Sequence, residues 1–317
     1  MDYRRQTKIF LIGSTLFAAS AAIALVANVP LRAARWLPVD RQVHALTYEP
    51  AECLASSHDS KKLRSALIGR AAFRTPLLLG GQAARAGLSC NSCHRNGRGN
   101  PDFQFPGLSG APGTADVTSS LMSSHRGDGL ANSVIIPDLA GPENRRKISR
   151  DENNQVLEKF IRGLIVEEFD GAEPSEMTIS GLANYVRMLS PMACADAAEK
   201  EVRLQPQLSD VRDAMQAAQF ALDDNDNATA RLMLASARTA LGTINERYAS
   251  DELAGDRRLL HDADLELSAI QNAIDLEADD ISLKIITFQS KMPRWSKTIE
   301  QHESMSLFNP EHLTSKP

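Results

Sequence analysis

The chain has 317 residues, of which 43% are hydrophobic and 24% are charged, a composition that excludes intrinsic disorder and collagen-like structure. The formal net charge is -5 and aromatic residues make up only 5%, so neither a basic phosphate-binding surface nor a base-stacking platform for nucleic acid is expected. The four cysteines are too few for a disulfide scaffold.

The N-terminus has the pattern of a membrane-targeting segment. Arg4, Arg5 and Lys8 precede an uncharged stretch over 9–29, which is long enough to cross a bilayer core of roughly 30 Å as a helix. We expect residues 1–36 to form an anchor in the inner membrane or, as the alternative, a cleaved signal that leaves a soluble periplasmic protein. Both interpretations place the rest of the chain in an oxidising compartment.

The remaining sequence divides into three parts. Residues 37–50 contain two prolines and are expected to be a tether, and residues 51–195 are expected to form the first folded domain. Residues 196–317 are acidic, poor in Gly and rich in Ala and Leu, so a helical domain is expected there. No strand-like alternation stands out, and we therefore predict an all-α chain.

Helices in the first domain are predicted from apolar spacing and capping residues. The first follows the cap candidate Asp59, the second follows Asp151, and the third begins near Ser175 and ends before Pro191. Between the first two, Gly and Pro residues break regular structure over about 95–145. So long a loop is unusual in a compact domain unless a large bound group organises it.

The acidic region is predicted to be a helical hairpin or small bundle. The run 223–227, which reads Asp-Asp-Asn-Asp-Asn, marks a turn between helices, and an apolar seam with three-four spacing follows. The seam fails at Glu277, and Pro293 is expected to kink or end the last long helix. The seam residues are Leu260, Ala263, Leu267, Ile270, Ile274 and Ile281. Such helices could serve a protein partner or self-association.

The chemistry is concentrated in a Cys-x-x-Cys-His motif formed by Cys90, Cys93 and His94. Two thiols three positions apart on one turn can each add to a vinyl group of a porphyrin, and the following imidazole can ligate the iron. The sequence therefore predicts one covalently bound haem c, attached through Cys90 and Cys93, with His94 as the proximal iron ligand.

Three other interpretations of the motif remain open. A thioredoxin-like dithiol needs a strand–helix–strand context, which the pattern lacks. A structural zinc site needs two further ligands, and thiolates are poor long-term zinc ligands in an oxidising compartment. A chance occurrence of so short a motif is the third. The predicted export favours haem, because covalent attachment of this kind takes place outside the cytoplasm.

The residues around the motif resemble the cytochrome c superfamily over about 60–190. The matching segments are 77–81 (LLLGG) and 87–89 (GLS) before the motif, 97–99 (GRG) after it, and 182–189 (LANYVRML), which looks like the last helix of a cytochrome c domain. In that family the last helix packs against the haem edge. The resemblance implies a cytochrome c-like haem domain with long irregular loops.

One segment also resembles half of a bacterial di-haem cytochrome c peroxidase. In 118–129 (TSSLMSSHRGDG), His125 stands shortly before an Asp-Gly pair, as a His or Met does in that family. Di-haem peroxidases pass electrons between two haems, whereas this chain has one haem motif. We therefore expect an electron carrier rather than an enzyme, one that exchanges single electrons with a redox partner protein. The alternative is a haem peroxidase or other small-molecule oxidoreductase with an open or displaceable sixth ligand.

The sixth iron ligand is left open by the sequence. His125 is the first candidate, because it lies in a glycine-flanked loop and resembles the peroxidase residue. Met122 is the alternative, followed by Met177 and Met188, of which the last has the position of a core side chain within a helix. Ligation by Met raises the reduction potential relative to ligation by His.

Cys53 and Cys194 bracket the haem region. Two leftover cysteines in an oxidising compartment most simply form a disulfide. Closing so long a loop stabilises the folded chain by about 5 kcal/mol in the chain-entropy model. Free buried thiols, or lipidation of Cys53, are the alternatives.

Overall fold

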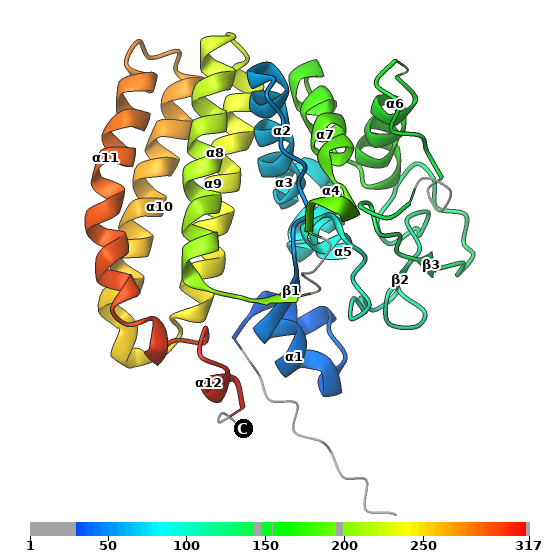
Figure 1. Cartoon of the computed structure of the whole chain (residues 1–317), viewed down its shortest axis with the longest axis horizontal. Helices are drawn as coiled ribbons and strands as arrows, with labels where there is room; N and C mark the ends of the chain where they lie inside the picture. The colour runs from blue at the N-terminus through cyan, green and yellow to red at the C-terminus, as the bar shows by residue number, and fades with distance from the viewer. Residues whose placement is uncertain (1–29, 143–146, 154, 195–198, 315–317) are drawn as a thin grey trace, which may run out of the picture.

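The computed structural model describes residues 30–142, 147–153, 155–194 and 199–314 (Figure 1). These residues are mostly helical, as predicted, although four short strands are also present. Of the predicted anchor or signal segment 1–36, residues 1–29 lie outside the described residues. None of the described helices combines the length and the apolar character needed to span a bilayer.

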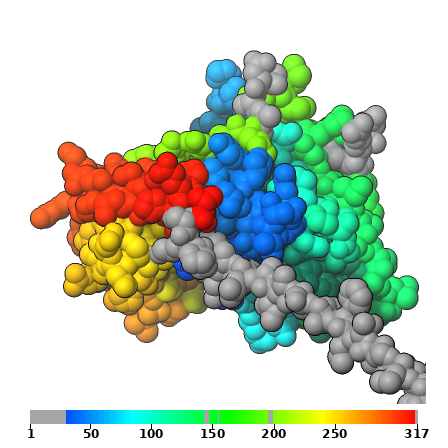
Figure 2. Space-filling view, turned by 90° about the horizontal axis from the view of Figure 1, so that it is seen from below, coloured from blue at the N-terminus to red at the C-terminus, as the bar shows by residue number. Residues whose placement is uncertain are grey.

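The chain from residue 30 to residue 50, part of it expected to be a tether, packs against the rest of the molecule. It forms two 3₁₀ turns, η1 (Arg32–Trp36) and η2 (Val39–Arg41), then helix α1 (Gln42–Thr47) and strand β1 (Tyr48–Pro50). Strand β1 pairs antiparallel with β4 (Glu199–Glu201). Strands of three residues are too short to show alternation, which is why the sequence pattern did not predict them. Figure 2 shows this blue segment between the red C-terminal residues and the cyan and green motif region, which is the part of 51–194 that the structure describes.

Two helices form the frame of the motif region. Helix α2 (Ser60–Phe73) begins as predicted after Asp59, whose carboxylate accepts hydrogen bonds from two backbone N–H groups of the first turn. Helix α7 (Glu176–Met188) begins after Ser175, whose hydroxyl accepts a hydrogen bond from the backbone N–H of Thr178. The two helices pack backbone to backbone, because a Cβ atom added to Gly69 would overlap the carbonyl oxygen of Gly181.

Several short elements follow α2 and precede α7 in the sequence. They are α3 (Pro76–Leu79), α4 (Gly81–Ala86), α5 (Cys90–Cys93), the 3₁₀ turn η3 (Arg95–Gly97), strands β2 (Thr114–Ala115) and β3 (Val134–Ile135), helix α6 (Val156–Gly163) and the π-helical turn η5 (Leu164–Glu168). The prediction that Asp151 caps the start of a helix is wrong. The Asp151 carboxylate accepts a hydrogen bond from the backbone N–H of Asn153, and α6 begins only at Val156. The described part of the segment after η3 is otherwise irregular, as predicted, apart from the β2–β3 pair.

The acidic region forms a small bundle of long helices, as predicted. The helices are α8 (Leu204–Asp223), α9 (Asn227–Arg247), α10 (Ala254–Asp275) and α11 (Ile281–Glu300), followed by the short α12 (Pro310–Thr314). All six predicted seam residues are buried. Asn225 and Glu277 have positive φ in the turns before α9 and α11. Helix α11 runs through Pro293 to Glu300, so this proline does not end the helix.

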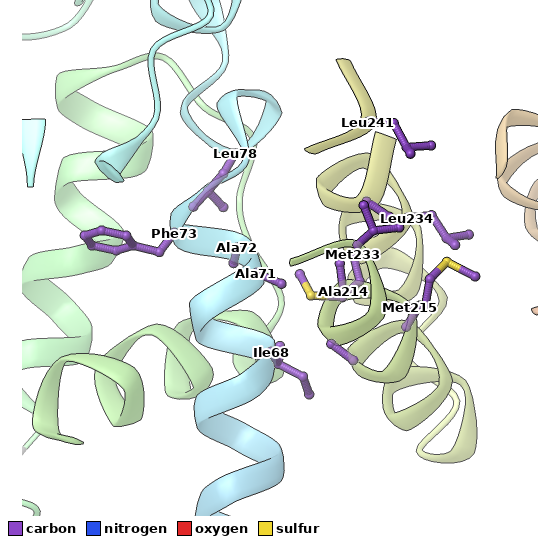
Figure 3. Close-up of a cluster of buried hydrophobic side chains, with 14 of the residues drawn as sticks. Ile68, Ala71, Ala72, Phe73, Leu78, Ala214, Met215, Met233, Leu234 and Leu241 are labelled. Atoms are coloured by element: carbon purple, nitrogen blue, oxygen red, sulfur yellow. The ribbon is translucent and has the colours of Figure 1, made fainter. Parts of the chain in front are cut away.

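The motif region and the bundle share one hydrophobic core. Figure 3 shows Ile68 and Ala71 on the side of α2 that faces α8 and α9, while Phe73 points to the opposite side. The hydroxyl of Ser236 on α9 donates a hydrogen bond to the carbonyl oxygen of Ala71 at 2.8 Å. One face of helix α2 therefore packs against the bundle, and the opposite face packs against the motif region.

Candidate functional site

The Cys-x-x-Cys pair lies on α5, a single helical turn. The backbone N–H of Ser89 donates to the hydroxyl of Ser92 at 3.0 Å, which fixes the start of the turn. The side chain of Asn100 donates to the carbonyl oxygen of Ser92 at 2.8 Å and fixes its end. Cys90 and Cys93 are thereby held on one rigid turn, with His94 directly after it.

Both motif cysteines are free and partly buried, and they pack against the hydrophobic core. Burial raises the pKa of the Cys90 thiol and of the Cys93 thiol to about 12, so both are neutral thiols at physiological pH. Zinc binds thiolates rather than thiols. In the part of the chain that the structure describes, no group of three or more His, Cys, Asp or Glu side chains is arranged to hold a metal ion.

His94 is fixed in one tautomer by the irregular segment. Its Nδ1 atom lies 3.0 Å from the carbonyl oxygen of Pro137, and because a carbonyl only accepts, Nδ1 carries the hydrogen. Burial lowers the pKa of His94 to about 4, against the opposing effects of the Pro137 carbonyl and Asp138. The ring is therefore neutral, and the lone pair of Nε2 is free to bind a metal.

The carbonyl that holds His94 is itself supported by an ion pair. Arg98 Nε donates to both carboxylate oxygens of Asp138 at 2.9 Å, and the backbone N–H of Ala140 donates to one of them. Arg98 Nη1 also donates to the sulfur of Cys53 at 3.3 Å. Asp138, the residue after Pro137, is thus bonded to Arg98 in the segment that follows the motif. In metal sites, such a second layer of hydrogen bonds orients a ligating histidine.

The predicted Cys53–Cys194 pair lies at disulfide distance. The two Cα atoms lie 5.3 Å apart, and the sulfur atoms are at bonding distance. Cys194 ends the 3₁₀ turn η6 (Pro191–Cys194), which follows α7. The backbone N–H of Ser190 donates to the carbonyl oxygen of Cys53 at 2.8 Å, so the backbone reinforces the covalent link.

The candidate sixth ligands lie in different environments. Met122 is 1% exposed within the hydrophobic core. The side chain of His125 is 63% exposed, and its Nε2 atom lies 3.8 Å from a carboxylate oxygen of Asp170. Met188 is buried on α7 and Met177 is partly buried, both among core side chains. Burial is a tertiary property, which the local sequence around these four residues does not encode.

A buried charge cluster beside the motif was not predicted. The carboxylate of Glu52 accepts hydrogen bonds from Arg70, from Arg74 at 2.8 Å and from the hydroxyl of Tyr185 at 2.7 Å. Burial alone would raise the pKa of Glu52, but Arg74 and Arg70, together with the Tyr185 hydroxyl, lower it to about 2. Arg74 also donates to the side chain of Asn96, two residues after the motif histidine.

The cluster extends from the motif to the bundle. Arg70 Nη1 lies 2.7 Å from a carboxylate oxygen of Asp210 and 3.2 Å from one of Asp213, both on α8. The members come from segments far apart in the sequence and have no common spacing, so no local signal could have identified them.

No protein-family model, curated protein or solved structure matches this chain. The assignment of its function therefore rests on the motif and on the geometry around it.

Proposed function

We propose that the chain is a c-type cytochrome, anchored to the inner membrane, which carries one covalent haem and transfers single electrons in the periplasm. The observation that carries the proposal is the neutral charge and the fixed tautomer of the His94 imidazole. It follows two free thiols on one turn, it is neutral, and its Nδ1–H is bonded to the Pro137 carbonyl, so that Nε2 is available for iron.

The residues present fit the group that the motif implies. Cys90 and Cys93 would attach the porphyrin, and His94 would ligate the iron on the proximal side. When bound, the haem iron supplies one-electron chemistry by alternating between two oxidation states. The backbone carbonyl of Pro137 would hold the imidazole in one orientation, and burial keeps the ring from taking up a proton.

For the sixth ligand we propose Met122 rather than His125. The choice rests on burial, because Met122 is 1% exposed and belongs to the same hydrophobic cluster against which Cys90 and Cys93 pack. His125 is exposed to solvent and lies beside Asp170. A thioether ligand would raise the reduction potential relative to a second imidazole.

The predicted export supports the periplasmic location. The basic and apolar pattern of 1–36 favours an anchor, and the Cys53–Cys194 pair is of a kind that persists in oxidising compartments. Electrons would come from and go to a redox partner protein, and the bundle α8–α11 offers a separate surface for a protein partner or for self-association.

Absorbance spectroscopy of the purified full-length protein tests this function. The reduced protein should show the sharp visible bands of a low-spin haem c, and carbon monoxide should leave them unchanged because both axial positions are filled. A prompt carbon monoxide complex in the native protein would contradict the proposal and favour an oxidoreductase with an open site.

A further inference from the structure

A cavity of about 250 Å³ lies where the N-terminal segment, the motif turn and helices α8 and α9 meet. Asn91 and Ser92, the two residues between the motif cysteines, line it, whereas Cys90 and Cys93 do not. The cavity is therefore separate from the proposed haem attachment site, and the proposed function leaves it unexplained.

Basic side chains outnumber acidic ones in the lining of this cavity. The charged side chains of the lining are Arg32, Arg70, Arg74, Arg95, Lys200, Arg247, Glu49, Asp210 and Glu246. Arg32 forms an ion pair with Glu246. Lys200 and Arg95 share a single carboxylate, Glu49, at 3.5 and 3.9 Å. The positive charge here therefore exceeds what the carboxylates neutralise.

Arg247 is a buried cation in this lining. It is 5% exposed and donates to two backbone carbonyl oxygens, that of Leu307 at 2.6 Å and that of Leu46 at 2.8 Å. Among the described residues, no carboxylate forms an ion pair with it. Burial, and then the nearby charge of Arg95, lower the pKa of Arg247 to about 10. Glu49 and Glu246 offset these effects only in part. A buried cation with no carboxylate in direct ion-pair contact is costly, and an anion in the cavity would relieve that cost.

We propose that this cavity binds a small phosphate-type dianion, with Arg247 and Arg95 as its principal ligands. Planar guanidinium groups bind phosphate oxygens through paired hydrogen bonds, which an ammonium group cannot reproduce. Neutral donors are also present in the lining. The side-chain oxygen of Asn91 accepts a bond from the backbone N–H of Asn96, so the amide N–H groups of Asn91 serve as donors.

Phosphate of this kind has two sources, a free phosphate compound or the headgroup of a phospholipid. Arg32 and Trp36 line the cavity and follow closely after the predicted membrane segment 9–29. A retained anchor would bring this part of the chain near the bilayer surface. Both sources share the same recognition chemistry, and the experiment separates them.

Isothermal titration calorimetry of the full-length protein tests the proposal, in a phosphate-free detergent at low ionic strength. Inorganic phosphate and a water-soluble short-chain phosphatidic acid are titrated separately. At least one should bind with one-to-one stoichiometry. Binding of inorganic phosphate identifies a free anion as the source, and binding of the lipid alone identifies a headgroup. Failure of both probes to bind overturns the proposal.

Charge variants make the test specific. Arg247→Lys should weaken binding about tenfold, because it removes the paired hydrogen bonds. Glu49→Gln should strengthen it several-fold, because it removes a competing carboxylate, and a merely unfolded variant could not do so. Arg231→Gln, on α9 outside this cavity, is the matched control and should change nothing. Affinities that are the same in the native protein, Arg247→Lys and Glu49→Gln would overturn the proposal whether or not haem is attached.

Discussion

His94 and Pro137 are 43 residues apart in the sequence, and a hydrogen bond of 3.0 Å joins the imidazole Nδ1 of the first to the carbonyl oxygen of the second. This contact gives the irregular segment after the motif a structural role, because it brings a backbone acceptor to the ring that would ligate iron. The Arg98–Asp138 ion pair holds that acceptor in position from the other side.

Asp138→Asn should raise the reduction potential of the haem. The Asp138 carboxylate favours positive charge at His94, and an oxidised iron carries one more positive charge than a reduced one. The expected shift is upward and on the order of tens of millivolts, measured by spectroelectrochemical titration. Asp128→Asn is the matched control, since Asp128 bonds only within its own loop. A potential that stays the same or falls in Asp138→Asn would show that the ion pair does not act on the ligand.

The sixth ligand is tested by a pair of alanine variants. Met122→Ala should remove the weak long-wavelength absorbance of a thioether–iron bond, lower the potential and open the iron to carbon monoxide. It should also cost about 2–5 kcal/mol of stability, because Met122 is a core side chain. His125→Ala should leave the spectrum and the potential unchanged. The reverse result, a spectral change in His125→Ala alone, would restore the sequence-based choice of His125.

Local signals explain what the sequence predicted. The start of α2 was predicted from the cap Asp59, and the start of α7 from the cap Ser175. The spacing of apolar residues predicted the buried face of α10. Both kinds of signal lie within a few helical turns, so a local sequence pattern contains them. The motif likewise depends only on neighbouring residues. The late start of α6 was missed because Asp151 bonds within its own turn and not to the first turn of a helix.

The rest of the site depends on contacts between distant segments. Pro137 meets His94, and Glu52 meets Arg74, only once the chain has folded, so neither pair leaves a spacing in the sequence. The same reason applies to the sixth ligand. Met122 and His125 are three positions apart in a segment without periodicity, and only tertiary packing buries one and exposes the other.

Glu52→Gln should destabilise the fold and change its acid unfolding. The pKa of Glu52 is lowered from 4.5 to about 2, so its stabilising effect is present above about pH 4.5 and is lost as the pH falls toward 2. At neutral pH the variant should lose about 3–5 kcal/mol, because Arg70 and Arg74 stay buried after losing the carboxylate that both contact, even though Asp210 and Asp213 remain near them. Urea unfolding at several pH values measures both effects.

The matched control for Glu52 is Glu173→Gln, which removes a carboxylate from an exposed ion pair with Arg162. Little change in stability is expected there. If Glu52→Gln and Glu173→Gln unfold at the same urea concentration at neutral pH, the buried cluster does not stabilise the junction between the motif region and the bundle.

Cys194→Ser should lower the free energy of unfolding by about 2–5 kcal/mol, because the Cys53–Cys194 link closes a long loop. A reducing agent should lower the thermal midpoint of the native protein toward that of the variant and leave the variant unchanged. A native midpoint that does not respond to full reduction, checked by counting free thiols under denaturing conditions, would show that the link adds no stability.

The central claim is that haem is bound covalently through Cys90 and Cys93. Intact-mass spectrometry of the denatured full-length protein, produced in cells that mature c-type cytochromes, tests it most directly. We predict an added mass of one haem on the native chain, and none on the Cys90→Ala/Cys93→Ala double variant expressed beside it. A native chain with the unmodified mass, from cells in which a known c-type cytochrome is fully matured, would contradict the account.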